Sequence, residues 1–402
     1  MLTRRGWMIA VGSLVLSGIG RVLGLDELFG MAAAALALCV AAVLYVRFTR
    51  FQLEATRELR PPRVHAGTAS RVELSVRNLA FRRSPVLTAR DPFDGGRRWA
   101  RLLLAPLAPG ETARAAYRLP TERRGIFDLG PLELQLNDPF GLAQTSLEAA
   151  PVTKLTVYPH ADDIEPVPLS QGNDPHAGAD HATALSHAGE DFYALRDYQE
   201  GDDLRRVHWG ATAKLDELMI RQEEMPWQGR ATVLLDLREG VHTPESLEIA
   251  VSAAASVARS CWKRRSLVRL LTTGGFDSGF AAGHAHREAV LEHLAGVGVE
   301  RGAHLAPLLQ RLRRDGSGGA LVVITTAAAG TPDLEGVARL RGRFGLVTLV
   351  LVERSAYDHS LAGRQAPSRA LPPLGMVARV TATEAFPTAW AGALARTKVA
   401  AR

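Results

Sequence analysis

Charged, aromatic and histidine side chains are concentrated between Gly189 and Trp209. Asp202 and His208 could act as a general base and the group that orients it, but this segment contains no serine or cysteine to serve as a nucleophile. Its arginines could instead pair with its carboxylates, because a planar guanidinium binds a carboxylate through two hydrogen bonds. Three interpretations stay open: a knot of ion pairs that joins two parts of the chain, a surface that recognises a protein partner, and a catalytic site.

Our candidate partner-binding residues are Arg196, Asp202, Arg205, Arg206, His208, Trp209 and Asp236. Trp209 combines a large apolar ring system with one N–H donor, so we expect it to be largely buried. Arg205 and Arg206 are adjacent, and we expect them to point in different directions. One should pair with Asp202 or Asp191, and the other should face solvent or a partner.

The same segment resembles a family signature. Residues 189–209 fit the pattern G-x-x-x-x-x-L-R-x-Y-x-x-G-D-x-x-R-x-[IV]-[DH]-W of the bacterial family called domain of unknown function 58 (DUF58). Residues 124–131 and 138–142 are similar to that family's R-G-x-[YF]-x-L-G-P and D-P-F-G-L segments. Gly210 stands where the family commonly has a lysine, so the chain departs from the family pattern at this position. The resemblance implies a membrane-anchored accessory protein that acts with a MoxR-type AAA+ ATPase and a transglutaminase-like membrane protein.

The resemblance also implies a von Willebrand factor A-like fold for the C-terminal half. Residues 231–236 form an apolar run that ends in Asp236, as is typical of a buried parallel strand. In metal-binding members of that fold the strand ends in D-x-S-x-S, and its acid and hydroxyls help to hold a divalent cation. Here Arg238 and Gly240 replace the hydroxyls, and Thr325-Thr326 stands where an aspartate is often found. Because too few oxygen ligands remain for magnesium, we predict a degenerate site at Asp236 and no metal or other cofactor.

The bulk composition excludes several classes of protein. The chain has 402 residues and a net charge of +6 that is spread along it. A diffuse excess of this kind suits an anionic lipid surface, whereas nucleic-acid binding usually needs a concentrated basic stripe, so we expect no nucleic-acid partner. The two cysteines, Cys39 and Cys261, cannot supply a disulfide framework or a thiolate metal site.

Two apolar stretches near the N-terminus predict a transmembrane hairpin. They cover about residues 7–23 and 28–46, and each is long enough to cross a hydrocarbon core as a helix. Arg4 precedes the first stretch and Arg47 follows the second, while the connector carries Asp26 and Glu27. The positive-inside rule therefore places both ends, and the domains that follow, in the cytoplasm. A cleaved signal peptide and a pair of buried soluble helices are the alternatives.

A strand-rich region should follow the hairpin. Residues 71–78 alternate polar and apolar side chains, and turn sequences separate similar runs up to about residue 155, which is typical of a small β-sandwich. We expect Asp138 to form a turn and Phe140 to fill the edge of this sandwich. His176, His181 and His187 lie in the polar segment that comes next, where their spacing favours a mobile linker over a zinc site.

The C-terminal half alternates strands and helices. Thr243 and Pro244 predict the start of a helix that buries Leu247 and Val251. We expect strands over 231–236, 266–272, 320–325, 346–352 and 377–381, and helices over 287–295, over 304–314 and at the C-terminus.

The predicted fold class is α/β plus β. In chain order we expect a transmembrane hairpin over residues 1–50, a β-sandwich over 51–160, a flexible linker over 161–188, the family signature segment over 189–225, and a von Willebrand factor A-like domain with a mostly parallel sheet over 226–402. The function we expect is that of a non-enzymatic scaffold or adaptor in the cell membrane, with two spans, soluble cytoplasmic domains, and contacts to the two protein partners and the lipid bilayer. A metal-dependent protein-binding module is the alternative. A membrane-bound hydrolase comes last, because Ser278, His208 and Asp236 lack the strand–G-x-S-x-G–helix context of a triad.

Overall fold

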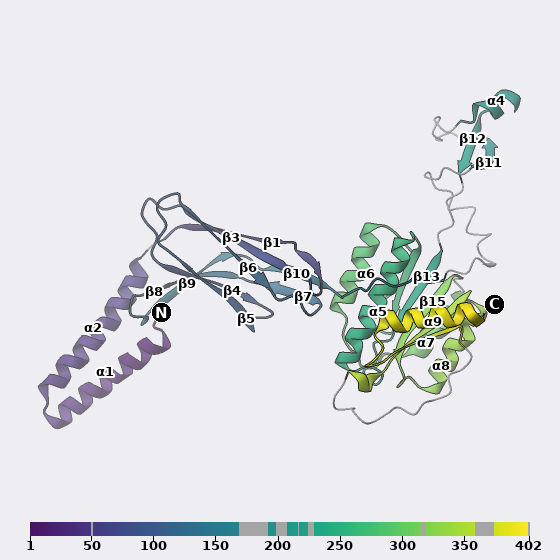
Figure 1. Ribbon diagram of the computed structural model, residues 1–402. Coiled ribbons are helices and arrows are strands. Elements are labelled where there is room, and N and C mark those ends of the chain that lie inside the picture. The colour runs from purple at the N-terminus through teal and green to yellow at the C-terminus, as the bar shows by residue number, and fades with distance from the viewer. Residues whose placement is uncertain are drawn as a thin grey trace. The chain divides into compact units, whose positions relative to one another are not determined.

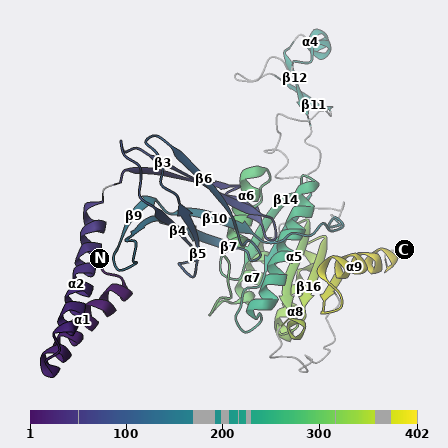
Figure 2. The same cartoon turned by 60° about the vertical axis from the view of Figure 1, so that its left-hand side comes forward.

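The computed structural model describes residues 1–49, 51–168, 192–197, 207–215, 217–223, 229–315, 318–357 and 374–400. The chain divides into two compact units, Met1–Tyr158 and Pro159–Arg402. Two helices and two sheets make up the first unit, one sheet antiparallel and the other antiparallel except for the parallel pair of β2 (Arg63–His65) and β10 (Thr153–Tyr158). A parallel sheet with helices is the centre of the second unit (Figures 1 and 2). The expectation of an α/β plus β protein is therefore confirmed at this coarse level. The signature residues 198–206 and most of the predicted linker lie outside the described residues.

Helices α1 (Arg4–Leu23) and α2 (Asp26–Phe48) pack against each other as a hairpin (Figure 1). The Thr3 side chain accepts a hydrogen bond from the Gly6 amide and so caps the start of α1. Gly24 ends α1 at φ 67°, a left-handed conformation that glycine adopts without a steric penalty. Both helices are long and apolar enough to cross a membrane. They extend the two predicted spans by two or three residues, including the ends where the flanking arginines Arg4 and Arg47 lie.

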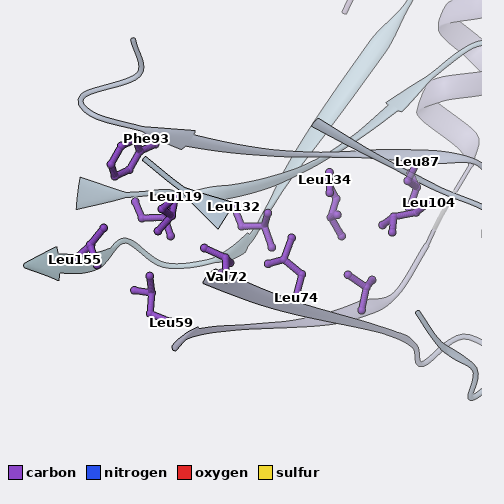
Figure 3. Close-up of a cluster of buried hydrophobic side chains, with 14 of the residues drawn as sticks. Leu59, Val72, Leu74, Leu87, Phe93, Leu104, Leu119, Leu132, Leu134 and Leu155 are labelled. Carbon is purple, nitrogen blue, oxygen red and sulfur yellow. The ribbon is translucent and has the colours of Figure 1, made fainter. Parts of the chain in front are cut away.

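Two sheets face each other in the rest of the first unit. One contains strands β1 (Leu53–Arg60), β3 (Ser70–Asn78) and β6 (Thr112–Leu119) in the order β1-β3-β6. The other has the order β2-β10-β7-β4-β8-β9 with β5 paired to β4, and comprises β2 (Arg63–His65), β4 (Leu87–Phe93), β5 (Arg98–Leu104), β7 (Gly125–Leu129), β8 (Leu132–Asn137), β9 (Gln144–Ala150) and β10 (Thr153–Tyr158). Alternate residues of both sheets fill one core, among them Val72, Leu74, Leu132 and Leu134 (Figure 3).

A buried polar group ties the two sheets together within this core. Arg57 of β1 contacts Asp91 of β4 at 2.6 Å, and both side chains are only 1% exposed. The Tyr117 hydroxyl of β6 donates to the other carboxylate oxygen at 2.6 Å. Burial raises the pKa of Asp91, although its bonds to Tyr117 and Arg57 oppose the rise. This group could not be predicted from the sequence, because its three residues come from strands far apart in the chain.

The second unit centres on a five-stranded sheet whose strands are all parallel. Its order is β14-β13-β15-β16-β17, with β13 (Arg230–Leu235), β14 (Leu267–Thr272), β15 (Ala320–Thr326), β16 (Leu346–Val352) and β17 (Met376–Val380). The helices are α5 (Pro244–Lys263), α6 (His284–Gly296), α7 (Leu305–Asp315), α8 (Thr331–Ala338) and α9 (Phe386–Ala400), with short 3₁₀ turns η2 (Arg339–Gly342) and η3 (Arg354–Ala356). The predicted strands and helices agree with these bounds to within a few residues; α8 was not predicted.

Helix α5 begins as the sequence indicates. Thr243 and Ser246 cap each other's backbone amides, and Pro244 occupies the first turn, where it loses no hydrogen bond. Leu247 and Val251 are buried against the sheet. Beside β14, the chain runs back in the opposite direction through bridges from Leu271 to Asp277 and from Val268 to Ala281. This segment adds an antiparallel edge to the parallel sheet.

Part of the signature segment forms a small substructure of its own. Strands β11 (Phe192–Asp197) and β12 (Met219–Glu223) pair antiparallel, and helix α4 (Trp209–Leu215) leads into β12. The His208 amide donates to the carbonyl of Met219 at 2.8 Å, which joins the start of α4 to β12.

Candidate functional site at the carboxyl ends of the parallel strands

Strand order reverses at β13 in the parallel sheet. The chain passes from β13 to β14 on one side, and later to β15 on the other side. The loops that follow β13 and β15 therefore leave in opposite directions. Open α/β sheets usually bind ligands in a crevice at such a switch point, outside the carboxyl ends of the strands, and we call this region of the chain the crevice. Asp236 follows β13 directly, and Thr325 and Thr326 end β15, so topology alone brings these residues to one place.

Asp236 and Arg238 form a bidentate ion pair in this crevice. Arg238 Nε donates to Asp236 Oδ1 at 2.9 Å, and Nη2 donates to Oδ2 at 2.8 Å. The carboxylate is fully buried, whereas the arginine side chain is 17% exposed. Thr325 adds a hydroxyl donor to Asp236 Oδ2 at 2.8 Å. Both carboxylate oxygens are thus satisfied by groups of the chain, as a buried charge requires.

The guanidinium also bridges to the far side of the crevice. Arg238 Nη1 donates at 2.8 Å to Oδ2 of Asp333, which lies in the first turn of α8 and is 20% exposed. Burial alone would lower the pKa of Arg238, but its hydrogen bonds and charge interactions with Asp236 and Asp333 outweigh burial and raise it. The group is therefore a permanent cation held between two carboxylates.

His242, which is buried, and Arg354, which is partly buried, add further polar groups near the ion pair. His242 is 2% exposed, and its Nε2 has no hydrogen-bond partner among the described residues. Its Nδ1 lies 3.3 Å from the Ser246 hydroxyl. Burial lowers the pKa of His242 to about 4, and the nearby charges of Arg354 and Arg238 add to this effect, while Asp236 opposes it. The imidazole is therefore neutral near pH 7. Arg354 donates from Nη1 to the carbonyl of Gly240 at 3.2 Å.

This arrangement bears directly on the predicted degenerate metal site. Arg238 lies in contact with both oxygens of the one acid left from the metal-binding pattern, so its guanidinium occupies the position beside Asp236 where a cation would bind. Within the described ranges, no group of three or more His, Cys, Asp or Glu residues could hold a metal ion. Chemically, the site can offer hydrogen-bond donors and a rim of charges to a partner.

The signature residues are placed only in part. Asp202, Arg205 and Arg206 lie outside the described residues, as does the side chain of Arg196. His208 accepts a hydrogen bond at Nδ1 from the Ala211 amide at 3.0 Å, as a side-chain cap of α4. The expectation that Trp209 is buried is wrong, because its side chain is 70% exposed at the start of α4.

Sequence reasoning missed three members of the crevice: His242, Asp333 and Arg354. His242 directly precedes the cap of α5, and Asp333 follows the Thr331-Pro332 helix start, so a signal for their position was present. The bond between Asp333 and Arg238 was not visible in the sequence, because it depends on the long connections between the strands.

Comparison with known proteins agrees with the resemblance of the signature segment. Residues 194–362 match the model of a family described as protein of unknown function DUF58. The match supports the DUF58 family. It extends from β11 to just beyond η3, and so includes Asp236, Arg238, His242 and Asp333. The apolar hairpin and the β-sandwich precede the DUF58 match. Among curated proteins, none matches this chain.

Several solved structures are similar to part of the chain. A crystal structure of a CARDB domain from Pyrococcus furiosus, in complex with di-metal ions, is 16% identical, and the alignment covers 27% of this chain and 94% of that chain with a TM-score of 0.21. The putative ApaA protein from Bordetella pertussis is 13% identical over 27% of this chain and 96% of that chain, with a TM-score of 0.21. Similarities at these TM-scores carry no argument about the DUF58 segment or its function.

Proposed function

We propose that this chain is a membrane-anchored, non-enzymatic adaptor whose α/β domain receives a protein partner at the carboxyl ends of its parallel strands. The observation that carries the proposal is the Asp236–Arg238–Asp333 bridge. A von Willebrand factor A-like domain would normally present a metal ion here, and a guanidinium takes its place. The site keeps the position and the positive charge of a partner-binding surface, but it has no open coordination position for catalysis or for a metal-mediated contact.

The anchor is the α1–α2 hairpin, inserted as two spans in the cell membrane. Arg4 and Arg47 lie at its open end, whereas Asp26 lies at its closed end. This asymmetry supports an orientation in which the open end, the β-sandwich and the α/β domain face the cytoplasm. The partners we propose are a MoxR-type AAA+ ATPase and a transglutaminase-like membrane protein, on the basis of the DUF58 resemblance.

A membrane pull-down with the full chain tests the adaptor function. The rim of the strand-end crevice carries an exposed ion pair, Arg301–Glu239, with the atoms 3.2 Å apart. Arg301→Glu should leave the fold intact because exposed pairs contribute little stability, but it should weaken capture through like-charge repulsion. Arg339→Glu is the matched control, because it disrupts a similar exposed pair, between Glu335 of α8 and Arg339, the residue that follows this helix.

The outcomes separate the alternatives. Nucleotide-dependent recovery of an AAA+ ATPase that is reduced by Arg301→Glu, and not by Arg339→Glu, supports the adaptor. Capture that requires magnesium and is lost with a chelator would favour the metal-dependent module instead. Equal capture by both variants would place the partner surface elsewhere, with the exposed Trp209 as the next position to test.

A further inference from the structure

One end of the β-sandwich gathers two loops beside the α1–α2 hairpin. In the strand registers, Leu87 pairs with Leu136, and Leu53 pairs with Asn78. The loop over residues 79–86 and the loop over 138–143 therefore emerge from the same end of the sandwich, where the chain also enters from α2. The Leu79 amide donates to the carbonyl of Gln52 at 2.9 Å, only four residues after the end of α2.

The second loop is fastened directly to the hairpin. The Thr3 amide donates to the carbonyl of Leu142 at 2.8 Å, and the Thr3 hydroxyl donates to that of Gly141 at 2.7 Å. Leu142 and Ala143 are buried in one apolar cluster with Cys39, Ala42 and Val46 of α2. The loop thus packs against the last turns of α2, beside the first turn of α1. A Cβ atom on Gly6 would lie only 2.1 Å from the Leu142 carbonyl oxygen, which leaves no room for a larger residue.

Each loop holds a phenylalanine away from the sandwich core. Phe81 is 98% exposed and Phe140 is 65% exposed, so the expectation that Phe140 fills the sandwich edge is wrong. The cause is local: Asp138 is buried and accepts from the amides of Phe140 at 2.8 Å and Ala143 at 2.5 Å, and this turn directs Phe140 outward.

The loop that carries Phe81 is equally well built. Asn78 is 1% exposed; its Nδ2 donates to the carbonyls of Arg82 at 2.8 Å and Leu107 at 2.9 Å, and its Oδ1 accepts from the Ala80 amide at 3.0 Å. A loop braced in this way displays an apolar ring at a fixed place. Arg82 and Arg83 follow Phe81 at once, and both are exposed.

We propose that Phe81 and Phe140 insert into the headgroup region of the anionic bilayer that holds the hairpin, with Arg82 and Arg83 contacting lipid phosphates. The proposal rests on the membrane anchoring proposed above. Three observations name the lipid surface as the occupant: the loops adjoin the ends of the apolar helices, exposed aromatic rings are typical of the membrane interface, and the adjacent charges have the sign that anionic lipids attract. The neighbouring loop carries an acid, Glu111. Its carboxylate accepts a hydrogen bond from the Ala108 amide of the same loop at 2.7 Å.

Site-specific fluorescence of the full chain in lipid nanodiscs tests this contact. Phe81→Cys and Phe140→Cys, labelled with an environment-sensitive dye, should emit at shorter wavelength than a label at the opposite end of the sandwich, Glu122→Cys. Phospholipids with a nitroxide near the headgroup should quench the first two labels several-fold more strongly than the third. A background in which both native cysteines are replaced by alanine keeps the label at the chosen position.

A fourth label, Leu14→Cys in the middle of α1, separates this proposal from the anchoring on which it rests. If nitroxides deep in the bilayer quench Leu14→Cys while Phe81→Cys and Phe140→Cys behave like Glu122→Cys, the chain is anchored but the loop contact is refuted. If Leu14→Cys is not quenched, the anchoring itself is wrong.

The charge of the lipid gives an independent arm. Replacing both Arg82 and Arg83 with glutamate should lower the quenching of a label at Phe81→Cys in nanodiscs that contain anionic lipid, whereas Arg118→Glu, on an exposed position of β6, should not. Quenching that is unchanged by the double variant, or equal in neutral and anionic nanodiscs, would contradict the role of the arginines. A Phe81→Cys label that leaves water only when a partner protein is added would overturn the lipid assignment.

Discussion

Arg238 provides the sharpest test of the strand-end site. Arg238→Leu keeps much of the side-chain volume but removes the cation that contacts both oxygens of the fully buried Asp236. Among the described residues, only the Thr325 hydroxyl and the Arg238 backbone amide, at 3.3 Å, then remain as donors to that carboxylate. Breaking a buried pair by removing one partner typically costs about 3–5 kcal/mol, because an uncompensated charge is left behind. Asp333 contributes less to this loss, since it is partly exposed and can hydrate.

Native-state hydrogen exchange of the full chain measures this loss in the domain itself. The amides of β13 and β15 lie in the centre of the sheet, so they should exchange only through its large-scale opening. A loss of about 3–5 kcal/mol should accelerate their exchange by roughly a hundredfold to several thousandfold, since a tenfold change corresponds to about 1.4 kcal/mol. Arg301→Leu, which breaks the exposed pair with Glu239, is the control and should change exchange by less than about fivefold, or about 1 kcal/mol.

A second variant shows whether the charge is the cause. Asp236→Asn combined with Arg238→Leu removes both charges, and an asparagine side chain can still accept from Thr325. The double variant should therefore be more stable than Arg238→Leu alone by at least about 1 kcal/mol. If Arg238→Leu accelerates exchange less than tenfold, or if the double variant is no better than the single one, then Arg238 does not neutralise a buried charge and the reasoning fails.

Three further predictions follow from the described residues. Magnesium or manganese should not raise the melting temperature. A specific site at a metal concentration a hundredfold above its Kd would add about 2.7 kcal/mol to the free energy of unfolding. A saturable rise in melting temperature that Asp236→Ala abolishes would therefore contradict this prediction. Burial holds the pKa of His242 at about 4, below the value of 6.5 in the unfolded chain, so the unfolded state binds the proton first as the pH falls. The free energy of unfolding should therefore fall by up to roughly 3 kcal/mol as the pH drops from 6.5 to 4. His242→Gln should remove this pH dependence. Trp209→Ala should change stability by less than about 0.5 kcal/mol, because the ring is 70% exposed, and a loss of several kcal/mol would show that it is packed against another part of the chain.

Local signals in the sequence were sufficient for most of the fold. Alternating residues identified the strands of the sandwich, continuous apolar runs identified the parallel strands, and the Thr243-Pro244 pair placed the start of α5. These features depend on neighbouring residues alone. The exposure of Phe140 could not be read in this way, because Asp138 turns the loop outward and the hairpin then covers its other side.

The strand-end site, too, could be predicted from the sequence only in part. Its departure from a metal-binding pattern was visible, since Arg238 stands two residues after Asp236 in place of a hydroxyl. Whether the guanidinium turned inward could not be predicted, because that depends on Asp333, which lies 95 residues along the chain and arrives through the first turn of α8. The arginine side chain is long and flexible, so it could turn either inward to the buried acid or outward to solvent. A second carboxylate, that of Asp333, fixes it in the inward orientation.

In the function proposed above, a covalently attached guanidinium stands where a von Willebrand factor A-like domain would hold an exchangeable ion, and this difference has a functional consequence. A metal can lend one open coordination position to an acidic group of the partner, and its removal abolishes binding. Arg238 already directs donors to both Asp236 and Asp333, so a partner gains little by adding a third carboxylate there. Recognition at this crevice should therefore depend on the rim, where the exposed Glu239 and Arg301 lie, and it should weaken with salt, as contacts between exposed charges do. Capture that is insensitive to both salt and chelators would refute a docking site at the strand ends.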